Sequence, residues 1–265
     1  MVPSWENRVV YITGASSGLG EGLALALARC GARLGLIARR QSLLDQLATQ
    51  VEAENTQVAI AVCDVSDQAA VEQAFKQLEL QLGPPDVLIA NAGSNTFLSI
   101  DKFDVAVADQ TIRTNLLGAL YCIGAVLPGM LRRGRGHIVG VSSISGFRGV
   151  AGAGPYSASK AGLSVLLESM RADLAPHGIA VTTVHPGFVR TPMTTGHRFP
   201  LPFLVERDRA VVIMLRGIER RRRQIAFPWP MVWTMRLVQL LPPVFWDWIG
   251  RLLNRRYPPL QRNGG

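Results

Sequence analysis

The chain has 265 residues, of which 48% are hydrophobic and 18% charged. This length suits one large α/β domain with a well-buried core and excludes a small disulfide-stapled or disordered class. The net charge of +9 is uneven: residues 1–215 carry 18 Lys and Arg against 17 Asp and Glu, whereas residues 216–265 carry 10 against 2. Because the excess lies in a tail that is also rich in aromatic residues, it does not indicate a nucleic-acid partner.

The few cysteines and histidines limit the compartment and the use of metal. Cys30, Cys63 and Cys122 lie far apart and form neither a CxxC pair nor a disulfide framework, so we expect a reducing compartment. No histidine has metal-ligand spacing, and we expect no metal site. The first eight residues lack the basic-then-apolar order of a signal peptide, which predicts a cytoplasmic protein.

Short apolar runs alternate with helical patterns along the chain. This alternation predicts an α/β class protein, a doubly wound Rossmann fold with a central parallel sheet of about seven strands and helices on both faces. The carboxyl ends of such strands form the ligand site. We expect strands near residues 8–13, 33–38, 57–62, 86–90, 136–142, 179–185 and 224–227, and helices near 18–30, 41–54, 67–82, 104–131 and 156–176.

A glycine-rich turn follows the first predicted strand. The segment Thr13–Gly20 reads Thr-Gly-Ala-Ser-Ser-Gly-Leu-Gly, comes after the apolar run 9–12, and precedes an Ala- and Leu-rich helix. Glycines let the backbone approach a pyrophosphate, and the helix N-terminus supplies N–H groups and a positive dipole end. Glycines also simply make turns, but the order of strand, turn and helix predicts a dinucleotide site.

The end of the second predicted strand bears on which dinucleotide is bound. Enzymes that prefer NAD generally place an acid here, against the ribose hydroxyl, whereas an Arg accommodates the phosphate of NADP. This chain has Ala38 followed by Arg39 and Arg40. Ala38 leaves room, and a guanidinium can pair with a phosphate bidentately. Both arginines could instead only solvate the next helix; the missing acid favours NADP(H) over NAD(H).

Tyr156 and Lys160 form a candidate proton-donating pair. Residues four apart lie on one face of a helix, and a neighbouring ammonium favours the phenolate, so Lys160 should lower the pKa of Tyr156 toward the range useful for acid–base catalysis. Ser143, thirteen residues upstream, can hold a substrate oxygen beside the phenol. A half-buried Tyr beside a solvated Lys is the plainer interpretation of this spacing when taken alone.

These motifs occur in a familiar order, and the chain resembles the short-chain dehydrogenase/reductase family, in its short single-domain form. The resemblance covers residues from about 8 to about 192. It departs mildly at Ala90, where the family often has Asn. The matching segments are Thr13–Gly20, Cys63-Asp64-Val65, Asn91-Ala92-Gly93, Asn115, Ser143, Tyr156-x-x-x-Lys160, and Pro186–Thr191.

The resemblance implies a catalytic tetrad of Asn115, Ser143, Tyr156 and Lys160. Tyr156 would act as the general acid/base, Lys160 would lower its pKa and bind the nicotinamide ribose, Ser143 would position the oxygen, and Asn115 would anchor a water of the proton relay. Ser142 is one residue out of register, and strand alternation points it the other way.

The resemblance also implies the cofactor contacts. Asp64 would bind the adenine amino group with Val65 near the ring, Asn91, Ala92 and Gly93 would lie beside the adenine ribose, and Thr191 would contact the nicotinamide amide. The full predicted set is Gly14, Ser16, Ser17, Gly18, Leu19, Gly20, Arg39, Asp64, Val65, Asn91, Ala92, Gly93, Tyr156, Lys160, Pro186, Gly187, Val189 and Thr191.

The segment Pro192–Leu204 occupies the position of the family's substrate loop. It is rich in Pro and apolar residues. Such a composition fits a lid over a lipophilic substrate, and it equally fits a lid that only packs on the domain. Steroid, retinoid, ketoacyl and ketolipid substrates all remain open.

The tail departs from the short family core. Two apolar, aromatic segments, 228–241 and 244–253, are separated by Pro242-Pro243 and contain four of the five Trp. Each is too short to span a bilayer, but Trp and Leu accompanied by Arg are typical of interfacial helices. We therefore divide the chain into a catalytic domain, 1–224, and an extension, 225–265. Peripheral membrane contact through 225–257, a subunit interface and a lid are the three candidate roles.

Two classes of function follow. The first is an NADPH-dependent oxidoreductase that reduces a carbonyl of a lipophilic small molecule or oxidises the corresponding alcohol, in a homodimer or homotetramer. The second is a non-catalytic NADP-binding sensor or membrane-docked scaffold. The pair of Tyr156 and Lys160 favours the enzyme, because a sensor needs no proton donor.

Overall fold

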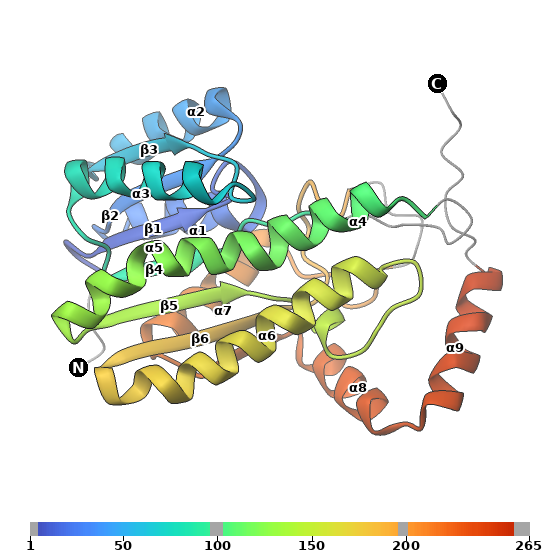
Figure 1. The fold of residues 1–265 in the computed structure, drawn as a ribbon. Helices are drawn as coiled ribbons and strands as arrows, with labels where there is room; N and C mark the ends of the chain where they lie inside the picture. Colours follow the sequence, from blue (N-terminus) through green and yellow to red (C-terminus); the bar gives the residue numbers. More distant parts are fainter. Residues whose placement is uncertain (1–4, 96–102, 196–200, 257–265) are drawn as a thin grey trace.

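The structure, a computed structural model, describes residues 5–95, 103–195 and 201–256, with only the backbone for 253–256. Residues 196–200 of the predicted substrate loop and the end of the predicted membrane-contact segment, residue 257, lie outside the described residues. Figure 1 shows the elements in chain order. They are β1 (Val9–Thr13), α1 (Gly18–Ala28), β2 (Arg33–Ala38), α2 (Gln41–Glu52), β3 (Val58–Val62), α3 (Gln68–Leu82), β4 (Val87–Ala90), α4 (Val105–Ile112), η2 (Arg113–Leu117), α5 (Gly118–Arg133), β5 (Gly136–Val141), η3 (Ile144–Gly146), α6 (Gly154–Leu174), η4 (Ala175–His177), β6 (Ile179–Pro186), α7 (Arg207–Glu219), β7 (Gln224–Phe227), α8 (Trp229–Leu240) and α9 (Pro243–Arg256).

The strands form one parallel sheet of seven strands in the order β3-β2-β1-β4-β5-β6-β7. The strand order reverses between β1 and β4. The connections that follow these two strands run to opposite faces of the sheet, which leaves a crevice at their carboxyl ends. This topology confirms the predicted doubly wound Rossmann fold.

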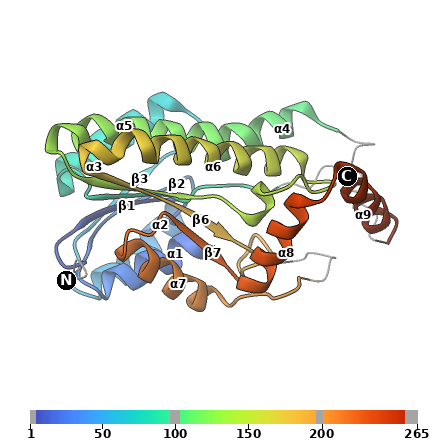
Figure 2. The same cartoon turned by 90° about the horizontal axis from the view of Figure 1, so that it is seen from below.

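Helices cover both faces of the sheet, as Figure 2 shows from below. One core lies between the sheet and α1, α2 and α7, and contains Val10, Leu36 and Val184. The other lies between the sheet and α3, α5 and α6, and contains Tyr11 and Ile138. Strands buried on both faces account for the near-continuous apolar runs in the sequence.

The long helix expected near residues 104–131 is interrupted. A π-helical turn, η2, separates α4 from α5 and places Asn115 inside the protein with none of its surface exposed. Such turns occur often at functional sites. The whole run, 105–133, is long and apolar enough to cross a bilayer, but 44% of its most apolar window is buried and it packs on α3 and α6, as a core helix does.

The helix α7 was not predicted. Its buried residues, Ala210, Val211, Met214, Gly217 and Ile218, follow helical spacing and pack on α1 and β7. The arginines between them mask this period in the sequence. The spacing itself is the signal that identifies the helix.

Candidate active site

A cavity of about 1320 Å³ lies at the carboxyl ends of the strands. Its walls come from the loops after β1 to β6, from the start of α6, and from α8 and α9. Most of the predicted cofactor residues line it: Gly14, Ser16, Ser17, Gly18, Leu19, Arg39, Asp64, Val65, Asn91, Ala92, Gly93, Tyr156, Lys160, Pro186, Gly187, Val189 and Thr191.

The glycine-rich turn leaves no room for side chains at two positions. Gly14 has φ +65°, and a Cβ there would lie 2.8 Å from the Cα of Ala92. A Cβ at Gly20 would collide with the carbonyl oxygen of Gly14, so Gly20 shapes the turn from within α1 and does not line the cavity. The turn is therefore a cradle open to a ligand and closed to side chains, which fits a dinucleotide pyrophosphate.

The neighbouring loop after β4 is fixed to this turn. The Oγ1 atom of Thr13 accepts hydrogen bonds from the backbone N–H groups of Asn91 and Ala92, each at 3.0 Å. The side-chain amide of Asn91 donates to the carbonyl oxygens of Thr13 at 3.0 Å and Gly14 at 3.3 Å. The two loops that border the crevice thus form one rigid unit.

At the end of β2, two arginines take different partners. Nη1 of Arg39 lies 3.4 Å from Oδ2 of Asp64. Nη2 of Arg40 donates to the hydroxyls of Ser16 at 3.0 Å and Ser17 at 2.8 Å. Both guanidinium groups line the cavity beside Ala38. The sequence interpretation named Arg39 alone for a phosphate contact, and the structure shows that Arg40 lines the same cavity.

Asp64 is held ionised in this corner. Partial burial acts to raise the pKa of Asp64, but hydrogen bonds from the backbone and hydroxyl of Ser66 and the charge of Arg39 outweigh it and lower the pKa. Oδ1 of Asp64 accepts from Ser66 N at 3.0 Å and from Ser66 Oγ at 2.8 Å. Asp64 therefore offers a fixed carboxylate to a hydrogen-bond donor.

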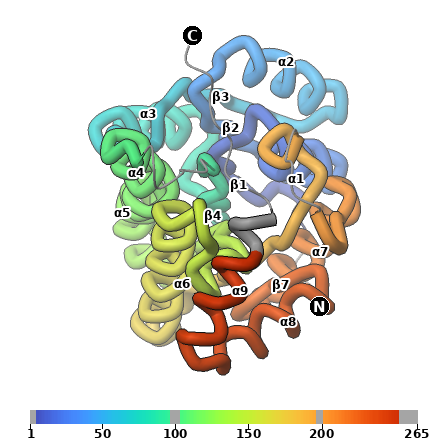
Figure 3. Tube along the Cα trace, turned by 90° about the vertical axis from the view of Figure 1, so that its right-hand side faces the viewer, coloured from blue at the N-terminus to red at the C-terminus, as the bar shows by residue number. Residues whose placement is uncertain are grey.

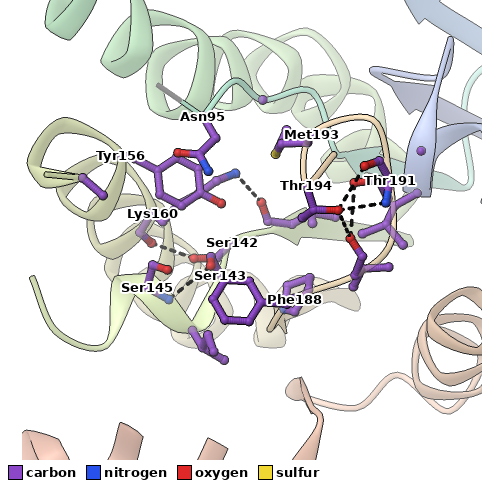
Figure 4. Close-up of a pocket in the computed structure, with 18 of the residues that line it drawn as sticks. Asn95, Ser142, Ser143, Ser145, Tyr156, Lys160, Phe188, Thr191, Met193 and Thr194 are labelled. Carbon is purple, nitrogen blue, oxygen red and sulfur yellow. Dashed lines mark hydrogen bonds between the residues drawn. The ribbon is translucent and has the colours of Figure 1, made fainter. Parts of the chain in front are cut away.

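The start of α6 brings Tyr156 and Lys160 to the cavity (Figure 4). Nζ of Lys160 donates to the carbonyl oxygen of Val141 at 2.8 Å and lies 5.9 Å from the centre of the Tyr156 ring. Only 4% of the Lys160 surface is exposed, and burial lowers its pKa to about 8. The solvated lysine of the plainer interpretation is therefore wrong.

The expected lowering of the Tyr156 pKa is also wrong. Burial raises the pKa of Tyr156, and a hydrogen bond with Ser143 opposes this rise only in part. The desolvation of the phenolate outweighs this hydrogen bond. The ammonium of Lys160 donates to the carbonyl oxygen of Val141.

The two serines after β5 have different surroundings. Oγ of Ser143 accepts from Ser145 N at 3.1 Å, and its side chain hydrogen-bonds with Tyr156 in the cavity. Oγ of Ser142 donates to the carbonyl oxygen of Lys160 at 2.7 Å and lies 2.8 Å from Oγ of Ser164. The Ser142 hydroxyl is thus engaged by α6, which leaves Ser143 as the serine that faces a ligand.

Asn115 does not line the cavity. Its Oδ1 accepts from Ser94 N at 2.7 Å, and its Nδ2 donates to Ser94 O at 2.9 Å and to Ser159 Oγ at 3.1 Å. A Cβ at Gly93 would lie 3.2 Å from Oδ1 of Asn115 and 3.3 Å from Nζ of Lys160. Asn115 therefore holds the segment after β4 against α6, one backbone layer behind the cavity.

Thr191 and Thr194 lie across the cavity from Tyr156 and Asn95 (Figure 4). The backbone N–H of Thr191 donates to Oγ1 of Thr194 at 3.0 Å, and that hydroxyl donates to Val189 O at 2.7 Å. Oδ1 of Asn95 is buried and has no hydrogen-bond partner among the residues that the structure describes. Asn95 thus presents a free acceptor next to the phenol, a feature that the sequence interpretation missed.

The helices α8 and α9 close the far end of the cavity. The residues they contribute are Met231, Met235, Trp246, Asp247, Gly250 and Arg251. The sequence interpretation named a lid as one role of these segments but named none of their residues. The signal in the sequence that could have identified these helices is the recurrence of apolar residues every three or four positions.

Arg148, in the loop between Ser143 and Tyr156, fastens this extension to the domain. Its Nη1 donates to carbonyl oxygens at the end of α8 and directly after it, those of Val238, Gln239 and Leu241, at 3.0–3.2 Å. Its guanidinium carbon lies 5.8 Å from the centre of the Trp246 ring. Two further bonds join the same loop to the extension, from Gln239 Nε2 to Phe147 O and from Trp246 Nε1 to Gly149 O, each at 2.8 Å.

A cradle for a pyrophosphate at the switch point of a parallel sheet, facing a buried Tyr and Lys pair, is typical of nicotinamide-dependent oxidoreductases. The sequence pattern described as short chain dehydrogenase matches residues 8–199. The chain belongs to this family, whose members use NAD or NADP and act on alcohol and carbonyl groups, and it is an oxidoreductase.

Relatives match nearly the whole chain. An uncharacterized oxidoreductase of Myxococcus xanthus is 41% identical over 93% of this chain and 97% of its own length. An uncharacterized oxidoreductase of Mycobacterium tuberculosis is 37% identical over 92% and 97%. The first alignment covers 246 residues, so it includes part of the extension beyond residue 224.

Solved structures agree with the fold. The apo form of LigD from Sphingobium sp. strain SYK-6 has a TM-score of 0.79 at 28% identity and covers 90% of this chain and 99% of its own. An alcohol dehydrogenase from the archaeon Thermococcus sibiricus, complexed with 5-hydroxy-NADP, has a TM-score of 0.75 at 26% identity and covers 83% and 95%.

Proposed function

We propose that this protein is an NADPH-dependent oxidoreductase that reduces the carbonyl group of a lipophilic small molecule, or oxidises the corresponding alcohol. The observation that carries the proposal is that one cavity joins three parts. These are the arginines at the end of β2, the group of Ser143, Tyr156 and Lys160, and an end formed by α8 and α9, where Met231, Met235 and Trp246 provide apolar surface beside the charged Asp247 and Arg251. A cofactor and a substrate fit end to end in such a cavity.

The side chains around Tyr156 divide the chemistry between them. NADPH, when bound, supplies the hydride for the carbonyl carbon. Tyr156 gives its phenolic proton to the carbonyl oxygen, which Ser143 orients by a hydrogen bond. Lys160 stabilises the phenolate that results, because an ammonium close to the ring lowers the free energy of the charged form. The resemblance assigns Asn115 to the proton relay; its hydrogen bonds to Ser94 and Ser159 support a positioning part in it.

The preference for NADPH over NADH rests on Ala38, Arg39 and Arg40. An acid at position 38 would repel the phosphate on the adenine ribose, and the small Ala38 leaves space for it. Arg40 already bonds two serine hydroxyls of the phosphate-binding turn, and Arg39 pairs only weakly with Asp64 at 3.4 Å. The hydrogen bonds of Arg40 use only its Nη2 atom, and the contact of Arg39 is long, so both guanidinium groups can also donate to a phosphate.

The expected homodimer or homotetramer belongs to the same proposal. Exposed apolar side chains on α4, α5 and α6 support such an interface, namely Val105, Ile112, Leu120, Leu131 and Val165. Sedimentation of the purified protein measures the number of subunits. The proposed place of action is the cytoplasmic surface of a membrane, argued below.

The test of the function is a panel of lipophilic ketones, aldehydes and alcohols in which the absorbance of NADPH is followed. We expect turnover of at least one lipophilic carbonyl with NADPH, and a higher kcat/KM than for a small polar carbonyl of the same reactivity. Tight NADPH binding with no turnover on any member of the panel would favour the non-catalytic sensor instead.

A further inference from the structure

The two helices of the extension leave apolar side chains in water at regular spacing. On α8, Trp229, Trp233, Leu237 and Leu240 are 60–80% exposed and recur every three or four residues. On α9, Val244, Phe245, Trp248 and Leu252 are 53–72% exposed with the same spacing. Each set therefore forms one stripe along its helix. We call the two stripes together the outer apolar surface.

The other sides of the same helices already have partners. Val232 is buried in the domain, Met231 and Met235 line the cavity from α8, and Trp246 and Gly250 line it from α9. The outer apolar surface is thus not needed to hold the extension in place. Figure 3 looks onto the end of the molecule where α8 and α9 lie. A monomer seldom leaves a large apolar area of this kind without a function for it.

Charge decides between the candidate occupants. Residues 229–265 contain five arginines and one acid, Asp247. Arg236 on α8 and Arg251 on α9 are exposed, and each falls at the edge of its stripe by helical spacing. Two copies of such a segment repel each other, whereas a surface of anionic headgroups attracts it. Three tryptophans on the stripes suit the boundary between headgroups and acyl chains.

The arginines before β7 take no part in this surface. Arg222 and Arg223 offer their carbonyl oxygens to Thr182 and Thr183, near the start of β7. They therefore lie toward the amino ends of the strands, whereas α8 leaves β7 at its carboxyl end. Arg222 and Arg223 therefore do not belong to the outer apolar surface.

We propose that the outer apolar surface binds an anionic lipid bilayer, with α8 and α9 lying in the plane of its headgroups. Helices of 12 and 14 residues are too short to cross a bilayer. Because the same helices form the wall of the cavity that holds Met231, Met235 and Trp246, this orientation brings that end of the cavity to the lipid. Resting on the proposed function, we infer that the substrate is a lipid-soluble carbonyl compound that reaches Tyr156 from the bilayer.

Flotation of the full-length protein with vesicles tests this proposal. The vesicles contain phosphatidylcholine alone or phosphatidylcholine with phosphatidylserine, at low and high salt. We compare the wild type with the double variant Trp233→Glu/Leu237→Glu on α8 and with Trp248→Glu on α9, none of which lines the cavity. Leu80→Glu is the matched control, because Leu80 is an apolar helical residue of α3 that is 89% exposed.

We expect the wild type and Leu80→Glu to float with the anionic vesicles, and to bind them more weakly at high salt. Each stripe variant should bind the anionic vesicles at least about tenfold more weakly than the wild type. NADPH-dependent turnover of a water-soluble carbonyl should be equal in all four proteins, which separates this proposal from the proposed function. Unchanged NADPH affinity and melting temperature show that the variants are folded.

Three results would overturn the proposal. The first is a wild-type protein that does not float with either kind of vesicle. The second is a pair of stripe variants that float as well as Leu80→Glu. The third is a wild-type oligomer that sediments as monomers in the stripe variants without any vesicle binding, which would assign the outer apolar surface to a second copy of the chain.

Discussion

Individual side chains in the cavity have different proposed roles, and single substitutions can distinguish them. At the end of β2, Arg39 faces Asp64 and Arg40 faces the hydroxyls of Ser16 and Ser17. The hydrogen bonds of Arg40 are the shorter ones, at 2.8–3.0 Å against 3.4 Å. Arg40 is therefore the better-oriented donor for the phosphate on the adenine ribose of NADPH.

Replacing Arg40 or Arg39 by Ala should raise the KM for NADPH while leaving that for NADH nearly unchanged. A charge-assisted hydrogen bond is worth about 1.5–3 kcal/mol, which predicts an increase of roughly 10- to 100-fold for NADPH. Initial-rate kinetics with both cofactors measure this. Arg29→Ala is the control, since Arg29 is exposed and pairs with Glu54. An equal loss for both cofactors would assign the two arginines a structural role.

Two buried histidines outside the chemistry should govern stability in mild acid. Burial lowers the pKa of His137 to about 3 and that of His185 to about 4, from an ordinary value of 6.5. The unfolded chain takes up protons below pH 6.5, whereas the folded chain keeps both rings neutral. The free energy of unfolding is therefore highest above pH 6.5 and decreases as the pH falls toward 4.

Urea unfolding at several pH values between 7 and 4 checks this dependence. His185→Asn should show a smaller decrease in the free energy of unfolding than the wild type across this window. His177→Asn serves as the control, because His177 is exposed. Parallel curves for the wild type and His185→Asn would mean that His185 does not contribute.

How far the sequence predicts the site differs from residue to residue. The glycine-rich turn and the Tyr156–Lys160 pair are local patterns, and most residues assigned from them line one cavity. The free acceptor of Asn95 and the turn of Arg40 toward Ser16 and Ser17 depend on segments far apart in the chain, which no local pattern encodes. The direction of the Tyr156 pKa shift was missed for the same reason, since burial is a tertiary property.

At the scale of elements, the extension is a wall of the cavity that is tied to a catalytic loop. Arg148 caps the carbonyl groups at the end of α8 and directly after it, and stacks near Trp246 of α9. The same loop connects Ser143 to Tyr156. Loosening this attachment should therefore widen the substrate end of the cavity and leave the cofactor end intact.

Arg148→Ala removes these hydrogen bonds and should raise the KM for a lipophilic carbonyl roughly 10- to 100-fold, as expected for one lost charge-assisted bond. NADPH affinity should not change. Hydrogen exchange over residues 229–252 should become faster, which a merely local defect would not produce. Arg132→Ala, an exposed residue of α5, is the control. Unchanged exchange in the extension would show that Arg148 is not its attachment.

The elements themselves were predicted well wherever the pattern is strong. The seven strands and the helices α1 to α3 lie within two residues of their expected bounds. The run expected as one helix near 104–131 contains the turn η2, a single π-helical turn in which Asn115 is buried and which the continuous apolar run does not reveal. The two segments of the tail are helices, but their contact with the cavity depends on the loop at Arg148 and cannot be predicted from either segment.

At the scale of the whole molecule, charge and apolar surface are concentrated at one end of the chain. Residues 1–215 are almost neutral, whereas 216–265 hold most of the excess positive charge and the exposed tryptophans of α8 and α9. One end of the cavity has the glycine-rich turn for a dinucleotide, and the other end has a wall whose outer side is apolar. This arrangement suits an enzyme that takes its cofactor from water and its substrate from lipid.

In the proposed reaction, Tyr156 gives a proton to a carbonyl oxygen during NADPH-dependent reduction. The direct test is Tyr156→Phe, which removes the phenolic hydroxyl and little volume. Turnover is followed by NADPH absorbance on a lipophilic carbonyl that the wild type reduces, and NADPH affinity by fluorescence. We predict a loss of turnover of roughly 10²- to 10⁴-fold, as for other general acids, with an unchanged NADPH affinity. A variant that binds NADPH normally and retains turnover close to that of the wild type would contradict the account.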